Sequence, residues 1–250
     1  MNLKKYFIIV VKIVQYNLKI IFAGKFIWFL LCAFAFFAFF MFQVAWDRTE
    51  INEGTIYNLL IFPCLLLIFY PVVFGIQNDE DNRILEIIFG IPNYRYKVWG
   101  VRMLMVYIAN YFILVIFSYV ANLMLYPVNI FEMAAQLIFP MLFFGNLAFM
   151  FSTITRSGNG TAVLMIILGL GFYIFMSTSA PATQTATQAA TQSIDNTLWN
   201  VYINPFTIPT NIHPVVWQDT ILKSRIFLSI SGIVWLLIGL LNLQKREKFV

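Results

Sequence analysis

Ser157, in the run Arg156-Ser157-Gly158-Asn159-Gly160, is the residue of this 250-residue chain that comes nearest to a potential nucleophile. A serine hydroxyl reacts only when a neighbouring base, usually histidine, accepts its proton. The single histidine, His213, falls on the opposite side of the membrane in the topology deduced below. Glycine and asparagine at this spacing favour a tight turn instead. We therefore predict no catalytic residue in this run.

Other patterns that carry chemistry are missing from the sequence. It contains no GxxxxGK(S/T) phosphate-binding loop, no GxSxG nucleophile turn and no HExxH zinc-binding helix. Cys32 and Cys64 belong to no CxxC or Cys/His pattern, so both are predicted to be small buried hydrophobic residues. The sequence thus predicts no metal and no cofactor in this chain, and any ATP hydrolysis has to occur in a partner.

The longest polar interruption of the chain, Gln77 to Gly100, reads QNDEDNRILEIIFGIPNYRYKVWG. Its acidic residues Asp79, Glu80 and Asp81 precede an apolar run. We place them at the start of a short helix, where exposed backbone N–H groups favour negative charge. Asp79 can also reach Arg83, four residues further along the same helix face.

Within this short helix, Ile84, Leu85 and Ile88 form an apolar ridge, and Gly90 and Pro92 end it. Two interpretations fit the pattern equally well. In one, the helix lies along the membrane surface and contacts only lipid; in the other, it docks a soluble partner.

Composition places the segment in a membrane protein. Of the residues, 61% are hydrophobic and only 11% are charged, whereas soluble domains carry about 25% charged residues. A span needs about 20 mainly apolar residues. The sequence predicts six: Phe26–Ala45, Ile56–Ile76, Val98–Tyr126, Ile130–Ile154, Thr161–Thr178 and Arg225–Leu243. Their runs are continuous rather than alternating, which favours an all-α integral membrane fold over a β-barrel.

The basic residues indicate the orientation. Six spans place both termini on one side, and that side then holds all of the 16 lysines and arginines except Arg48, Lys223 and Arg225. The positive-inside rule therefore predicts cytoplasmic termini. The net charge of +5 is explained by this orientation and does not indicate nucleic-acid binding.

Residues 1–25 precede the first predicted span and have an amphipathic pattern. Lys4, Lys5, Lys12, Gln15 and Lys19 gather on one helical stripe. The sequence predicts an interfacial helix with its lysines among lipid headgroups. A short seventh span is the alternative, but it would bring two lysines into hydrocarbon.

Polar residues inside the spans have two possible roles. Tyr107, Tyr111, Ser118 and Asn122 lie within about 60° of one another on the third predicted helix, and Asn146 lies in the fourth. They either line a transport pathway or hydrogen-bond neighbouring helices, and the second role is commoner for uncharged groups. No charged side chain is predicted deep in a span, which favours an amphipathic or lipid-like substrate.

Proline and glycine positions predict how the helices bend and pack. Pro63 and Pro71 are expected to kink the second span. Close helix packing is expected at four glycines, Gly169, Gly171, Gly232 and Gly239.

The run Glu80…Asn82-Arg83-Ile84-Leu85-Glu86-Ile87-Ile88…Ile91-Pro92…Tyr94-Arg95 resembles the cytoplasmic segment between the second and third spans of ABC-2 type permeases, the membrane subunits of ABC exporters. The family usually has Gly-Thr-Leu-Glu where this chain has Arg83-Ile84-Leu85-Glu86. It also has an interfacial helix before six spans. Its enlarged connection between spans five and six, here 179–224, carries an Asn-Pro-Leu-Thr element similar to Asn204-Pro205-Phe206-Thr207.

The resemblance implies one transmembrane domain, 1–250, in which 77–97 is a coupling helix docked on a separate ABC ATP-binding subunit. The implied contact residues are Glu80, Arg83, Ile84, Leu85, Glu86, Ile88, Pro92 and Arg95. ATP and magnesium would bind in that partner, and two permeases with two ATPases would form the working unit. The resemblance also implies a bacterial inner membrane as the location. The alternative function is a non-transporting scaffold or assembly factor that recruits a cytoplasmic partner.

Overall fold

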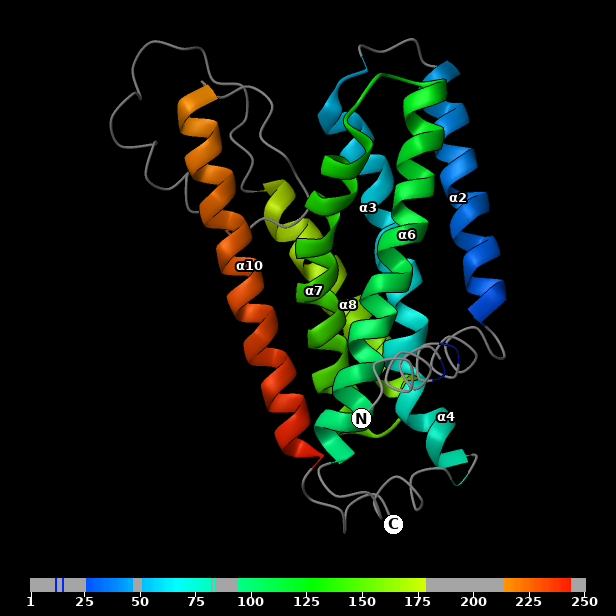
Figure 1. Ribbon diagram of the computed structural model, residues 1–250, viewed down its shortest axis with the longest axis vertical. Coiled ribbons are helices and arrows are strands. Elements are labelled where there is room, and N and C mark those ends of the chain that lie inside the picture. The colour runs from blue at the N-terminus through cyan, green and yellow to red at the C-terminus, as the bar shows by residue number, and fades with distance from the viewer. Residues whose placement is uncertain are drawn as a thin grey trace, which may run out of the picture.

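The computed structural model describes residues 12, 15, 26–46, 51–81, 83, 94–178 and 214–243. Every regular element in these ranges is helical, as the sequence predicts, and none is a strand (Figure 1). In chain order the elements are α2 (Phe26–Trp46), α3 (Glu53–Val73), α4 (Gly75–Asp81), the π-helical turn η1 (Arg95–Gly100), α6 (Val101–Met124), α7 (Ile130–Thr155), α8 (Gly158–Thr178) and α10 (Pro214–Asn242).

Five stretches of helix in the described residues are long and apolar enough to cross a membrane, which indicates an integral membrane protein. They are Phe26–Trp46, Glu53–Asp81, Tyr96–Met124, Ile130–Thr155 and Ile221–Asn242. Apart from Lys12 and Gln15, the predicted interfacial helix 1–25 lies outside the described residues. The same holds for 84–93, the greater part of the predicted coupling helix, and for 179–213.

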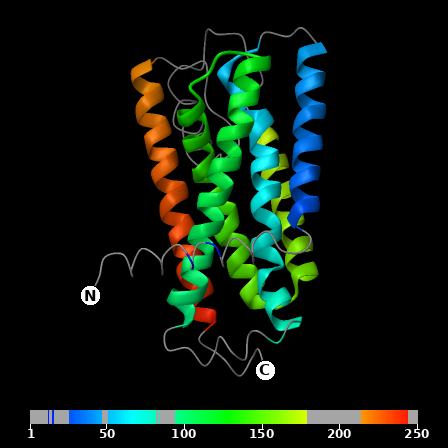
Figure 2. The same cartoon turned by 45° about the vertical axis from the view of Figure 1, so that its right-hand side comes forward.

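Helix α7 is the centre of the bundle. It packs against α3, α6, α8 and α10, and its most extensive contact is with α10. Helices α10 and α2 stand at opposite edges of the bundle in both views (Figures 1 and 2). Helix α2 turns most of its surface outward, and only Phe26, Ala33 and Phe37 are buried. The polar sites of the protein are therefore built around α7 and its neighbours.

Helix α3 ends soon after its second proline, and the chain continues as α4. The nitrogen of Pro71 carries no hydrogen, so it donates no helical hydrogen bond. The helix bends at Phe74, where φ is −96° and ψ is −6°, although the Phe74 N–H still bonds the Tyr70 carbonyl at 3.1 Å and its carbonyl accepts from the Asn78 N–H at 2.9 Å. The predicted bend in the second span thus occurs three residues after Pro71.

The position of the three acidic residues corrects the sequence prediction. Asp79, Glu80 and Asp81 lie at the end of α4 and not at the start of a helix. Arg83 follows with a φ of 56°, a left-handed conformation that ends the helix. The prediction was wrong because helical hydrogen bonding continues through the bend at Phe74 and carries the helix through the acidic residues.

Helix α10 begins eleven residues before the predicted span, at Pro214, so the last part of the predicted connection 179–224 is helical. Arg225 consequently lies inside the helix and is only 5% exposed. Its Nε donates to Gln136 Oε1 at 2.8 Å, and its guanidinium lies over the rings of Tyr57 and Phe139. Arg225 lies near the end of the candidate span Ile221–Asn242 and not deep within it, and α3 and α7 provide a polar and aromatic environment for the charge.

The glycines confirm close packing in α10 and contradict it in α8. A Cβ atom at Gly232 would meet the α7 backbone at 3.2 Å, and one at Gly239 would meet the Phe149 ring at 2.8 Å. At Gly169 and Gly171, a Cβ atom would meet nothing within 4 Å. The missing side chains bring α10 against α7, whereas the same residue type leaves open space beside α8.

Gly232→Leu is expected to lower the free energy of unfolding by about 1–3 kcal/mol, because the added side chain has to displace the α7 backbone. Chemical unfolding of the purified protein in detergent micelles measures the change. Gly171→Leu is the matched control, since the space around Gly171 is open, and it should change the value by less than about 0.5 kcal/mol. Equal effects of the two substitutions would contradict the packing assigned to α10.

Candidate functional site

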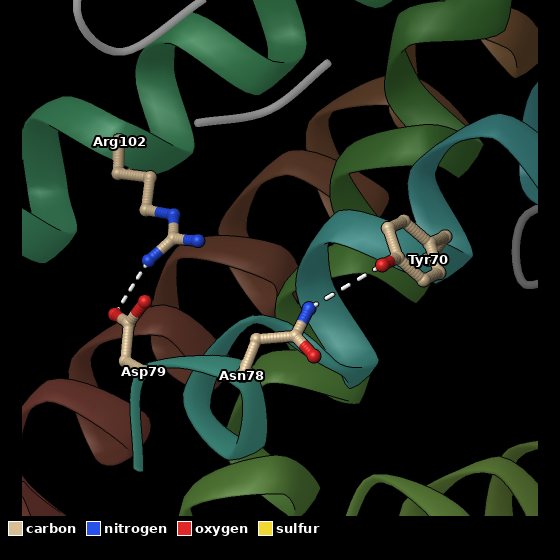
Figure 3. Close-up of polar contacts among 4 residues, drawn as sticks. All are labelled: Tyr70, Asn78, Asp79 and Arg102. Atoms are coloured by element: carbon tan, nitrogen blue, oxygen red, sulfur yellow. Dashed lines mark hydrogen bonds and ion pairs between the residues drawn. The ribbon is translucent and has the colours of Figure 1, made fainter. Parts of the chain in front are cut away.

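The most polar buried region described lies at the end of the bundle that carries α4, here called the α4 end. Its central contact is an ion pair in which Arg102 Nη1 lies 2.6 Å from Asp79 Oδ2 (Figure 3). The Arg102 and Asp79 side chains are only 10% and 5% exposed. Asp79 comes from α4 and Arg102 from the second position of α6, so the pair joins the two helices that flank the predicted coupling segment.

The aromatic residue Trp99 completes the surroundings of this pair. The Arg102 guanidinium carbon lies 5.1 Å from the centre of the Trp99 ring, within the range of a cation–π contact. Arg102 Nε and Trp99 Nε1 are buried, and neither has a hydrogen-bond acceptor among the described residues. A buried donor without an acceptor costs about 1–3 kcal/mol. The ion pair therefore fixes the position of α4 without making every available hydrogen bond.

Two further side chains of α4 form hydrogen bonds at this end. Gln77 Oε1 accepts from the Gly158 N–H at 2.7 Å and so satisfies a backbone donor in the first turn of α8. Asn78 Nδ2 donates to Tyr70 Oη at 3.4 Å (Figure 3). A Cβ atom at Gly158 would lie 2.4 Å from the Phe74 ring, so this approach of α8 to α4 requires glycine.

Side chains also satisfy carbonyl groups at the ends of the other helices. Ser152 Oγ donates to the Val73 carbonyl at 3.0 Å, Asn242 Nδ2 donates to the Thr153 carbonyl at 2.7 Å, and Tyr94 Oη donates to the Leu243 carbonyl. These bonds join α7 to α3, α10 to α7, and the start of η1 to the end of α10. The α4 end is thus a connected set of helix ends, and α4 is part of it.

Only part of the predicted coupling segment is described. Glu80 and Arg83 are exposed, and Arg95 begins η1. The other five predicted contact residues, Ile84, Leu85, Glu86, Ile88 and Pro92, lie outside the described residues. The predicted pairing of Asp79 with Arg83 is wrong, because Arg83 leaves the helix and Arg102 takes its place. The sequence analysis missed one signal. Asp79 lies just after the second apolar segment and Arg102 near the start of the third, so the two ends that face each other carry opposite charges.

Three of the polar residues predicted to line a pathway, Tyr107, Asn122 and Asn146, form hydrogen bonds within the protein. Tyr107 Oη donates to Asn146 Oδ1 at 2.6 Å and so joins α6 to α7. Asn122 Oδ1 accepts a backbone N–H of the following loop at 2.8 Å. Ser118 is fully buried, and Tyr111 is partly buried. The bond between Tyr107 and Asn146 is the helix–helix contact that the sequence left as the alternative, and the pathway role stays a prediction.

Asp79→Leu is expected to lower the free energy of unfolding by about 3–5 kcal/mol, because it leaves the Arg102 charge buried without a counter-ion. The double variant Asp79→Leu/Arg102→Met should recover most of this loss, since no charge is then buried. Chemical unfolding in detergent micelles measures both.

Glu80→Leu is the matched control, because Glu80 is the next residue of α4 and is exposed. It should change the free energy of unfolding by less than about 0.5 kcal/mol. If Asp79→Leu were no more destabilising than this control, the ion pair would not be what holds α4 to α6.

The described residues contain no group of three or more His, Cys, Asp or Glu side chains placed to hold a metal ion. Their polar chemistry at the α4 end consists of an ion pair and hydrogen bonds that connect helices. Comparison of the chain with protein-family models, with curated proteins and with solved structures found no match.

Proposed function

We propose that this chain is the membrane-spanning subunit of an ABC-type exporter, driven by a separate ATP-binding subunit that docks on the segment Gln77–Lys97. ATP and magnesium bind in that partner, and two copies of each subunit form the working unit. The proposal rests on the resemblance of this segment to the corresponding segment of ABC-2 type permeases and on the attachment of α4.

The attachment of α4 is the observation that carries the proposal. Asp79 holds α4 against α6, and Gln77 holds it against the first turn of α8. The coupling segment begins within α4 and leads through η1 into α6. Both ends of the segment are therefore continuous with helices that the ion pair locks together. A force applied to the segment reaches the bundle directly.

Three routes carry such a force from the α4 end. The ion pair between Asp79 and Arg102 leads to α6, and the bond between Gln77 and Gly158 leads to α8. The bond from Tyr94 to the last turn of α10 leads to the opposite edge of the bundle. In the proposed mechanism, ATP binding draws the two ATPase subunits together, and the coupling segments pass this motion to the helices, which open alternately to the two sides.

The break between α3 and α4 supplies the hinge that this mechanism needs. Regular helix geometry is interrupted at Phe74, which has φ −96° and ψ −6°, and Ser152 of α7 donates to the carbonyl of the buried Val73. A buried ion pair beside two unpartnered donors is a poor means of gaining stability. Its presence at this hinge is accounted for if the position of α4 relative to α6 has to be set by a directional contact.

The proposal includes an orientation. The α4 end faces the cytoplasm, as the distribution of lysine and arginine predicts. Six helices cross the membrane, with α8 as the sixth beside the five long apolar stretches, and residues 1–25 lie along the inner surface of a bacterial inner membrane. The ATP-binding subunit then meets the bundle at the end where α4, α6, α8 and α10 are joined.

The double variant Leu85→Asp/Glu86→Ala is expected to release the ATP-binding subunit, because it places a carboxylate on the apolar ridge and removes a polar contact. Loss of about 2 kcal/mol at such a position weakens binding roughly 30-fold. The measurement is the amount of ATPase activity that co-purifies with the tagged chain from native membranes in mild detergent.

The control variant Asn159→Ala/Gly160→Asp also introduces a carboxylate at the α4 end, at exposed positions outside the coupling segment. It should retain the partner at the wild-type level. If no ATPase co-purifies with the wild-type chain, the exporter proposal is wrong. A co-purifying protein without ATPase activity would favour the scaffold alternative.

A further inference from the structure

A cavity of about 430 Å³ lies between α3, α7 and α8. Its walls are apolar and include Phe62 and Phe69 of α3, Phe144 and Ala148 of α7, and Met165 and Gly169 of α8. This volume falls within the range of cavities that hold small organic ligands, about 300–1,000 Å³. Protein interiors contain few voids larger than a water molecule, so a space of this size needs an explanation.

Small residues and the loose contact of α8 create this space. Helix α8 makes fewer contacts with α7 and α3 than α10 makes with α7. A Cβ atom at Gly169 would meet nothing within 4 Å, so the α8 wall is open at this point. On the opposite wall, a Cβ atom at Gly145 would lie 2.8 Å from Tyr107 Oη, so that side is closely packed. The cavity is therefore a gap beside α8, bounded by a closely packed wall of α7.

The mouth of the cavity faces outward from the bundle. Three of its lining residues, Phe62, Ile166 and Leu170, are exposed over 47%, 55% and 56% of their surface. Because α3 and α7 are helices that can span a membrane, the surroundings at this depth are hydrocarbon. An apolar cavity does not retain water. Hydrocarbon from the bilayer surrounds the mouth of the cavity and is as apolar as the cavity walls, so we take it as the occupant.

The depth of the cavity fits one part of a lipid. Met165 and Leu170 lie seven and twelve residues beyond Gly158 on α8, about 10 and 18 Å along the helix. Half of a hydrocarbon core is about 15 Å thick. A lipid with its headgroup level with the start of α8 would thus bring the end of its acyl chain to the cavity. With the lipid in this position, the exposed Arg156, just before α8, would lie at the level of the headgroup phosphate.

We propose that this cavity binds the terminal half of a phospholipid acyl chain, which enters sideways between α3 and α8 from the leaflet at the α4 end. The inference requires that the helices lie in a membrane, but it does not require a partner ATPase. Its outcome is therefore independent of the exporter proposal.

The test uses the full chain in phosphatidylcholine vesicles that contain a small fraction of phosphatidylcholine with a diazirine near the end of one acyl chain. After illumination, mass spectrometry locates the labelled residues. Phe144 and Ala148 of α7 are 5% and 2% exposed, so a lipid chain labels them only from within the cavity. The outward face of α2, which carries Trp28 and Phe39, provides the reference for ordinary lipid contact.

Gly169→Phe should reduce labelling of α7 about fivefold relative to α2, because the phenyl ring occupies the space of the chain. Gly171→Phe is the matched control: it adds the same ring to α8 with equal space, but it is rotated by about 200° and does not line the cavity. It should leave the labelling ratio unchanged. Gly169→Leu provides a smaller filling side chain if the phenylalanine variant does not fold.

Two results would overturn the proposal. In one, α7 of the wild-type chain is not labelled above background, which would mean that lipid does not enter or that a second copy of the chain fills the space. In the other, the substitutions at positions 169 and 171 reduce labelling equally, which would mean that labelling does not depend on the cavity.

Discussion

A backbone N–H or carbonyl group that is buried away from water needs a hydrogen-bond partner within the protein, and this constraint acts on the buried helix ends of the described bundle. Within the described helices, the backbone satisfies itself. At the α4 end, side chains supply what the helix ends lack. Ser152 and Asn242 donate to carbonyls of neighbouring helices, and Gln77 accepts from a free N–H of α8. Each bond that satisfies one helix end also ties it to another helix, so the same constraint that shapes the helices connects them.

The ion pair between Asp79 and Arg102 belongs to this set but differs in kind. Two charges attract strongly where the dielectric constant is low, yet removing them from water offsets much of that attraction. The pair therefore contributes direction more than stability. It selects one position of α4 against α6, next to an interruption in the helix at Phe74. A short helix held by a directional contact beside a hinge is suited to passing on a movement, and this links the geometry to the proposed role of the segment that follows.

The bundle is packed unevenly around α7. On one side, Gly232 and Gly239 let α10 approach until backbone atoms and an aromatic ring are in contact. On the other, α8 contacts α7 through the ring of Phe172, but the space beside Gly169 and Gly171 is open. Dispersion forces depend on close atomic contact, so α10 is held firmly and α8 less so. The hydrogen bond from the Gly158 N–H to Gln77 also helps to position α8.

Composition and the lengths of the apolar runs were sufficient to predict a helical membrane protein and the approximate helices, because hydrophobic length is a local property of the chain. The bend after Pro71 was predictable for the same reason, since proline lacks its N–H wherever it occurs. Three features were not predictable from the sequence: the partner of Asp79, the burial of Arg225 within α10, and the different roles of four similar glycines. Each depends on which helix lies opposite, and a pattern along one helix does not specify the side chains of another. The sequence by itself determined which segments enter the membrane; only the tertiary structure decided which of them meet, because charge pairing and close packing are properties of two surfaces together.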